Sequence, residues 1–232
     1  MVNLCEHEDG KGPKNDLSLA QALSGRSSDP CVGKFLEFRV IPMKASTDTS
    51  KALTDTDTLI PNPDLSKMKV TRERTFEFGR SGGGTDSAPW TIKTDGGQGL
   101  AAAVDRISAA PTLGTLEVWH LKNGGGGWDH PIHIHFEESQ LLARNGSLSN
   151  VPPWERGRKD TYRLHPGGSV TIAMQFREFA GMFMEHCHNI VHEDHAMLLR
   201  YEVGRGLVPL PTPIPTPQGV KFISTSVLKG SY

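Results

Sequence analysis

The sequence contains few cysteines, no long apolar run and no recognisable export signal. Three cysteines occur in 232 residues, and an odd number cannot all pair within one chain. No stretch approaches the roughly 20 consecutive apolar residues that a transmembrane helix needs, so no membrane span is predicted. The first residues, MVNLCEHEDGKGPKND, are polar and acidic and lack the apolar centre of a secretory signal.

Neither sign of charge is in excess. Lys and Arg number 25 against 26 Asp and Glu, which gives a formal net charge of -1. This balance predicts neither nucleic acid nor an anionic membrane surface as a partner. The apolar content of 36% is ordinary, and the length fits one full domain with extensions.

The pattern along the chain is typical of β structure. Short runs of apolar and β-branched residues are separated by clusters of glycine and proline such as SGGG, DGGQG, NGGGG and HPGGS. The expected strands cover residues 34–40, 74–80, 115–121, 169–176 and 196–203. Short strands with frequent turn signals predict an all-β sandwich or barrel.

Two segments differ in composition from this β core, which we place at residues 67–205. Residues 42–66 are rich in Thr, Asp, Ser and Pro and are predicted to be a linker. Residues 206–232 form a tail whose PLPTPIPTPQG stretch favours an extended, solvated chain. The strand expected at 34–40 has little sequence before it to pair with, so we expect residues 1–66 to pack poorly or against another chain.

The stretch MFMEHCHNIVHEDHAM, residues 182–197, places a cysteine between two histidines. Side chains alternate between the two faces of a strand, so His186 and His188 point one way and Cys187 the other. One tripeptide can then serve two sites that are joined by only a few covalent bonds. Such an arrangement suits the movement of electrons between two metals.

A second histidine-rich stretch, DHPIHIHFEE, occupies residues 129–138. His133 and His135 are two residues apart and share a face. We expect Pro131 to break the alternation, so that His130 points elsewhere. This stretch, too, divides its histidines between two directions.

The ligands on the cysteine side form a recognisable set. His130, Cys187 and His192 supply one thiolate and two imidazoles, and Met197 can add a weak axial thioether, which is the ligand set of a blue copper electron-transfer centre. The other four histidines of HPIHIH and HCH form an all-imidazole group suited to copper that reacts with dioxygen: His133, His135, His186 and His188. A structural zinc site typically uses more cysteines. A cupin-like HxH site accounts for the pair at 133 and 135 but not for HCH.

The two motifs, HPIHIH and HCHNIVHEDHAM, resemble the C-terminal copper-binding motifs of the multicopper oxidases, the laccase-like family. The flanking segments PWTIKTDGG, EVWHLKNGGGGWDHP and GRKDTYRLHPGGSVTIAMQFREFAGMFMEHCH are also similar, and SSDPCVGKFLEFRV resembles the last strand of a preceding domain. The resemblance covers roughly residues 27–204. It implies a cupredoxin-like Greek-key β-sandwich at 67–205, with residues 1–41 as the remnant of another cupredoxin domain.

The resemblance also implies a role for each ligand. Type 1 copper is held by His130, Cys187, His192 and Met197; type 2 copper by His133; and the type 3 pair by His135, His186 and His188. In the family, a small reducing substrate, a phenol or a metal ion, gives single electrons to type 1 copper beside the residue matching His192. The electrons then pass through the cysteine to its neighbouring histidines, and the three-copper cluster reduces dioxygen to water.

The chain departs from the family pattern because only the third and fourth copper motifs are present, so half of the three-copper ligands are missing. We therefore expect missing N-terminal cupredoxin domains or a partner chain; a degenerate descendant of the family is the alternative. The resemblance implies a periplasmic or secreted protein. The alternative function is a stand-alone type 1 electron-transfer cupredoxin without oxidase activity, although such a carrier has no use for the all-imidazole group.

Several nearby residues carry weaker expectations. We expect Asp129 and Glu137 or Glu138 to orient imidazoles, and Glu185 to be a polar neighbour of the type 1 site. Met182 and Met184 are expected in the core. We place His120 and His165 on loops or the surface. His195 lies between the ligand candidate His192 and the axial candidate Met197, where facing the substrate or solvent is one option. Cys5 and Cys31 are either free thiols or a disulfide pair.

Overall fold

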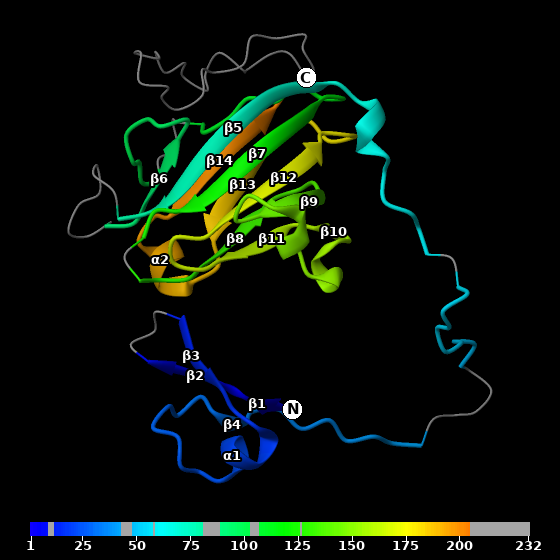
Figure 1. The fold of residues 1–232 in the computed structure, drawn as a ribbon, viewed down its shortest axis with the longest axis vertical. Helices are drawn as coiled ribbons and strands as arrows, with labels where there is room; N and C mark the ends of the chain where they lie inside the picture. Colours follow the sequence, from blue (N-terminus) through cyan, green and yellow to red (C-terminus); the bar gives the residue numbers. More distant parts are fainter. Residues whose placement is uncertain are drawn as a thin grey trace. The chain divides into compact units, whose positions relative to one another are not determined.

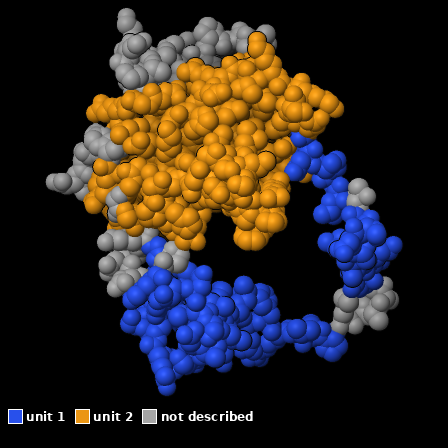
Figure 2. Space-filling model, viewed as in Figure 1, with its two compact units in different colours: residues 1–63 blue, residues 64–232 orange. Residues whose placement is uncertain are grey.

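The structure is a computed structural model, and it describes residues 1–8, 12–42, 48–57, 59–80, 89–102, 107–125 and 127–204 (Figure 1). The predicted tail at 206–232 lies outside these residues. The chain divides into two compact units, residues 1–63 and residues 64–232 (Figure 2). None of the helices within the described ranges is long and apolar enough to span a membrane.

The first unit is small and has short elements. They are β1 (Val2–Asn3), β2 (Cys5–Glu8), β3 (Gly12–Asp16), α1 (Leu19–Leu23) and β4 (Gly33–Lys34). β2 and β3 form an antiparallel hairpin, and β1 pairs with β4. α1 begins at a capping box in which Ser18 accepts from the Gln21 backbone N–H and the Gln21 side chain accepts from the Ser18 N–H.

The strand predicted at 34–40 is wrong, because β4 ends at Lys34. Residues 35–42 form no helix, strand or turn, and most of their apolar side chains are exposed. A strand needs a neighbour to accept and donate its backbone hydrogen bonds. β1 is only two residues long and provides no neighbour beyond the start of this segment.

The second unit is a sandwich of two sheets. The first sheet has the order β10-β9-β12-β7-β5-β6, and the second has the order β11-β8-β13-β14. β5 runs parallel to β7, and the other pairs are antiparallel. The strands are β5 (Val70–Gly79), β6 (Thr91–Thr94), β7 (Leu116–Asn123), β8 (His130–Ile134), β9 (Ser139–Arg144), β10 (Arg158–Lys159), β11 (Thr161–Leu164), β12 (Ser169–Gln175), β13 (Gly181–Cys187) and β14 (Leu198–Val203).

Short helical turns complete the second unit. They are η1 (Leu65–Lys67), η2 (Leu148–Asn150), η3 (Pro153–Glu155) and α2 (Ile190–Asp194), which follows β13. The four remaining predicted strands are confirmed as β5, β7, β12 and β14. β12 follows its alternation closely: Val170, Ile172 and Met174 are buried in the core between the sheets. The predicted all-β sandwich is thus the observed architecture.

Among the described residues, one ion pair has both side chains almost fully buried. Arg74 on β5 donates to both carboxylate oxygens of Glu117 on β7, at 2.6 and 3.0 Å, and the Trp119 indole N–H donates to the same carboxylate at 2.8 Å. All three side chains are at most 3% exposed. A charge pair removed from water depends on such hydrogen bonds for its stability; both carboxylate oxygens of Glu117 are paired here, whereas the second terminal nitrogen of Arg74 has no partner within the described residues.

Candidate metal centre

β13 carries the cysteine and delivers it to the core. Its last residues alternate as expected: Glu185 and Cys187 face the core between the sheets, and His186 between them points to the opposite face of the strand, where it is also buried. His188 follows directly after the strand and is exposed. The tripeptide therefore presents sulfur on one face and imidazoles on the other, as predicted.

β8 lies beside β13 and supplies the facing histidines, with His186 opposite His133 and Cys187 opposite Ile132. The expected break at Pro131 is wrong, because this residue lies within β8 and pairs with Arg163 of β11. His130 and His133 point to opposite faces because they are three residues apart in a regular strand.

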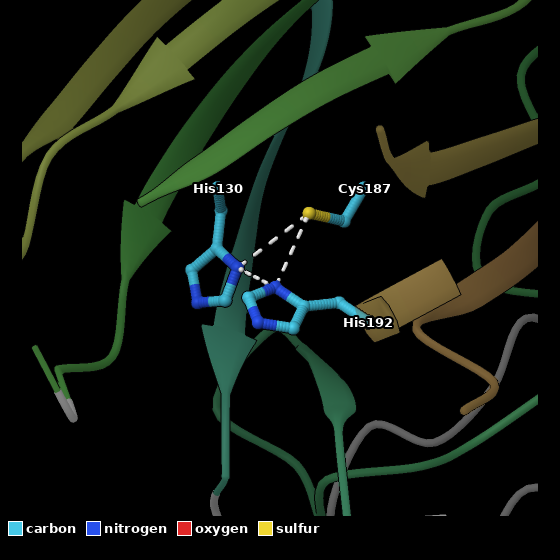
Figure 3. A group of neighbouring side chains, drawn as sticks. All are labelled: His130, Cys187 and His192. Atoms are coloured by element: carbon cyan, nitrogen blue, oxygen red, sulfur yellow. Dashed lines mark hydrogen bonds between the residues drawn. The ribbon is translucent and has the colours of Figure 1, made fainter. Parts of the chain in front are cut away.

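The first cluster, here called the cysteine cluster, consists of His130, Cys187 and His192 (Figure 3). The Cys187 Sγ lies 3.6 Å from the Nδ1 atom of each histidine, and the two Nδ1 atoms are 3.0 Å apart. His192 reaches the cluster from α2, whose start is capped by Asn189. All three side chains are fully buried.

These distances fit one bound metal ion. Three atoms separated by 3.0 to 3.6 Å can all lie about 2 Å from a common centre, which is the length of metal–nitrogen and metal–sulfur bonds. The donor set of one thiolate and two imidazoles suits copper. The Nε2 atoms of both histidines point away and have no hydrogen-bond partner in the part of the chain that is described.

Burial sets the protonation of the cluster. It lowers the pKa of His130 to about 4 and that of His192 to about 3, so both imidazoles are neutral at pH 7 and can donate a lone pair. Burial raises the pKa of the Cys187 thiol to about 12. A metal that binds here must therefore displace the thiol proton, which makes its affinity dependent on pH.

Two tryptophans cover the cysteine cluster. The Trp90 ring lies 3.8 Å from the His192 ring between centroids, and Trp128 meets the same imidazole edge-on at 5.1 Å. The Arg80 guanidinium lies over the Trp90 ring at 5.0 Å. This aromatic cover keeps water from His192. The histidine motifs did not predict these two tryptophans as neighbours of His192, although GGWDHP places Trp128 two residues before His130.

Met197, the predicted axial ligand, lies beside the cluster and is fully buried. Its backbone N–H donates to the His192 carbonyl at 3.0 Å, and its carbonyl accepts from the Cys187 N–H at 3.2 Å. It follows Ala196, whose φ of 71° turns the chain sharply between α2 and β14. Met197 is thus tied to the two ligand residues through its own backbone.

The second cluster, here called the imidazole cluster, lies on the other face of β8 and β13. His133, His186 and His188 bring ligand nitrogens within 4.8 Å of one another. His135 adjoins them, with its Nε2 atom 3.1 Å from that of His186. The four predicted histidines are therefore neighbours. Burial is the main cause that lowers the pKa values of His135 and His186, which keeps these imidazoles available as donors.

The groups that orient the imidazoles differ from the expected ones. Glu193 of α2 lies 3.1 Å from the Nδ1 atom of His186, and the Asp160 carbonyl lies 3.2 Å from that of His133. The expected carboxylates instead pair with arginines: Asp129 with Arg163, Glu137 with Arg177, and Glu138 with Arg158. Glu193 directly follows the ligand candidate His192, which is the signal that would have found it.

Other expectations are also settled. Met182 and Met184 are not in the core but are exposed on the outer face of β13. His120 is not on a loop but in β7, where Thr171 and Glu73 contact its ring nitrogens. His165 is exposed and pairs with Asp129, and no disulfide joins Cys5 to Cys31.

The family model described as multicopper oxidase matches residues 62–206. The chain belongs to the multicopper oxidase family. It is 34% identical over 192 residues to a laccase of Haloferax volcanii, an alignment that covers 81% of this chain and 31% of that protein. It is 38% identical over 130 residues to the bilirubin oxidase of Albifimbria verrucaria, covering 55% of this chain and 21% of the relative.

The chain thus spans no more than about a third of these two relatives. Among solved structures, a laccase from Pediococcus acidilactici matches with 29% identity and a TM-score of 0.45, over 63% of this chain and 31% of that one. Membership in the multicopper oxidase family confirms the resemblance seen in the two histidine motifs. It also confirms the predicted cupredoxin-like sandwich and makes copper the implied cofactor.

Proposed function

We propose that this chain is the C-terminal portion of a laccase-like oxidase that takes single electrons from a small reducing substrate and passes them toward dioxygen. One observation carries the proposal: β13 and the residue after it present Cys187 to the cysteine cluster and His186 and His188 to the imidazole cluster. Bound copper would supply one-electron redox chemistry at the first cluster and dioxygen reduction at the second.

Each group of residues has a defined task in this proposal. His130, Cys187, His192 and Met197 hold type 1 copper; His133 holds type 2 copper; and His135, His186 and His188 hold the type 3 pair. The backbone that links Cys187 to its two neighbours joins the sites by the shortest covalent route. The Glu193 carboxylate, 3.1 Å from the Nδ1 atom of His186, is close enough to orient that ring.

The surface around the imidazole cluster supports a partner that completes the site. His188 is exposed. Phe136, which follows His135 in sequence, is 57% exposed. Met184, whose carbonyl accepts from the His135 N–H at 2.8 Å, is 44% exposed. Exposed apolar side chains beside an exposed ligand candidate favour an interface. We propose that missing cupredoxin domains or a partner chain cover this face and add the imidazoles that this chain lacks.

Copper loading of the full chain tests the proposal. We expect an intense blue absorption that Cys187→Ser abolishes, because the colour requires thiolate bonded to copper. The matched control is Cys31→Ser, which removes an exposed thiol in the first unit and is expected to leave the band unchanged. A colourless copper-loaded wild type, or a band that survives Cys187→Ser, would contradict the assignment.

Oxidase turnover separates this function from a stand-alone electron carrier. The chain alone is expected to bind copper in the cysteine cluster but not to oxidise dimethoxyphenol with dioxygen. Turnover is expected when a partner that carries HxH motifs is co-expressed. A carrier would stay inactive under both conditions, and the four neighbouring histidines of the imidazole cluster argue against that alternative.

A further inference from the structure

Two segments of the first unit remain aligned antiparallel beyond their short ladder. β1 and β4 pair with Asn3 opposite Gly33. Further along the same two segments, the His7 N–H donates to the Asp29 carboxylate at 2.8 Å. In an antiparallel pair the numbers of facing residues have a constant sum, and these two contacts share that sum. The alignment therefore runs from residue 3 to residue 7 on one segment and from residue 33 back to residue 29 on the other.

Cys5 and Cys31 occupy the facing positions midway along this alignment. The side-chain amide of Asn3 joins them, because its Nδ2 atom donates to the Cys5 carbonyl at 3.2 Å and to the Cys31 carbonyl at 2.9 Å. The backbone N–H of Cys5 donates to Asn3 Oδ1 at 3.0 Å, and that of Cys31 donates to Asp29 Oδ1 at 2.8 Å. These side-chain hydrogen bonds take the place of the ladder and hold the two backbones in register.

The spacing of such a facing pair suits a disulfide. Directly opposite residues of an antiparallel pair have Cα atoms about 4.5–5.5 Å apart, which falls within the separations of about 4.4–6.8 Å found across disulfides. Cys31 is exposed and Cys5 is half-buried, so a reagent in solution can reach this pair. The third cysteine, Cys187, is fully buried in the second unit and does not compete for such a reagent.

We propose that the Asn3 amide aligns Cys5 and Cys31 as a redox-active pair, which closes to a disulfide when it meets a small-molecule disulfide. In the structure both cysteines are thiols. The exposed Cys31 attacks one sulfur of the reagent as a thiolate and releases the first reduced thiol; Cys5 then attacks the Cys31 sulfur and releases the second. Two electrons and both thiol protons pass to the reagent, which leaves as two thiols. The bridge closes residues 5–31 into a loop and restricts the unfolded chain.

Equilibration of the metal-free full chain in a glutathione redox buffer tests the proposal. Trypsin releases Cys5 within residues 1–11 and Cys31 within residues 27–34, so mass spectrometry of the unreduced digest shows which cysteines are joined. We expect these two peptides to be linked to each other, the intact chain to lose two hydrogens, and Cys187 to remain a thiol that is alkylated after unfolding. Cysteines that stay reduced, glutathione adducts without a link, or a link to Cys187 would overturn the proposal.

Variants distinguish an aligned pair from two thiols that meet by chance. Cys5→Ser and Cys31→Ser are each expected to stop at a glutathione adduct on the remaining cysteine of the pair. Asn3→Ala is expected to lower the equilibrium ratio of disulfide to dithiol about fivefold, because it removes the amide that joins the two carbonyls. The control Asn15→Ala removes an amide that donates to Glu6 at 3.0 Å, and it is expected to close like wild type. Equal closure in the two asparagine variants would overturn the proposal.

Discussion

Replacing Glu185 by glutamine is expected to stabilise the fold at neutral pH and to have little effect in acid. Glu185 is fully buried on β13, and neither of its carboxylate oxygens has a hydrogen-bond partner within the described residues. Burial raises its pKa from 4.5 to about 8, against smaller opposing effects of the Ser108 hydroxyl and the Arg74 guanidinium. The side chain is therefore protonated in the folded chain at pH 7.

The sign of the pH effect follows from the protons bound in each state. Between pH 4.5 and about 8, folded Glu185 keeps its proton while the unfolded side chain loses it, so stability falls as pH rises through this window. Each pKa unit corresponds to about 1.4 kcal/mol, so the wild type loses about 3 kcal/mol between roughly pH 4 and pH 7 through this residue. Glutamine does not titrate and avoids that loss.

The assay is urea unfolding of the metal-free chain at a series of pH values. The difference between Glu185→Gln and wild type cancels contributions from other titrating groups, so it isolates this carboxyl. Glu178→Gln, at an exposed position, is the control and is expected to give a small, constant difference. The reasoning would be refuted if the Glu185→Gln difference did not grow with pH, or if it shrank.

Three further predictions follow from buried groups. In the Glu185→Gln variant, stability is expected to fall from pH 6.5 to about 4 by about 3 kcal/mol through each of His130 and His192, because each unfolded imidazole gains a proton that the folded side chain does not bind; a flat profile in urea titrations would contradict this. Arg74→Leu is expected to cost about 3–5 kcal/mol in urea unfolding, and Arg74→Leu/Glu117→Leu clearly less, because only the single change strands a charge. Trp90→Ala is expected to raise the pKa of His192 in the metal-free chain toward 6.5, as followed by NMR, since burial is the main cause of its low value; an unchanged titration would show that Trp90 does not shield the ring.

The histidine motifs separated the two clusters because strand alternation decides which residues of HCH and HIH share a face, whereas His192, which lies on α2, was assigned from the ligand set. Spacings of one and two residues in HCH and HIH decide which side chains share a face, whatever surrounds them. The same alternation separates His130 from His133, so the special role given to Pro131 was unnecessary. Strands with buried alternating residues, such as β12, were equally accessible to prediction.

What the sequence did not reveal depends on contacts between distant segments. Glu193 reaches His186 only because α2 folds back beside β13, and Trp90 meets His192 across about a hundred residues of sequence. The predicted strand at 34–40 failed for a related reason: its pattern is suitable, but pairing requires a neighbour that this chain does not place there. Local pattern predicts the capacity to form a strand, not the presence of a partner.

The placement of Cys187 at the end of β13 makes the length of that strand, as well as its composition, matter. Removing or adding one residue upstream within the strand would reverse the face to which each later side chain points. The sulfur of Cys187 would then point toward the imidazole cluster, and the imidazoles of His186 and His188 toward the cysteine cluster. Both clusters would be lost at once although no ligand had been mutated. Changes of two residues would preserve the orientation, so this segment tolerates even-numbered length changes far better than odd ones.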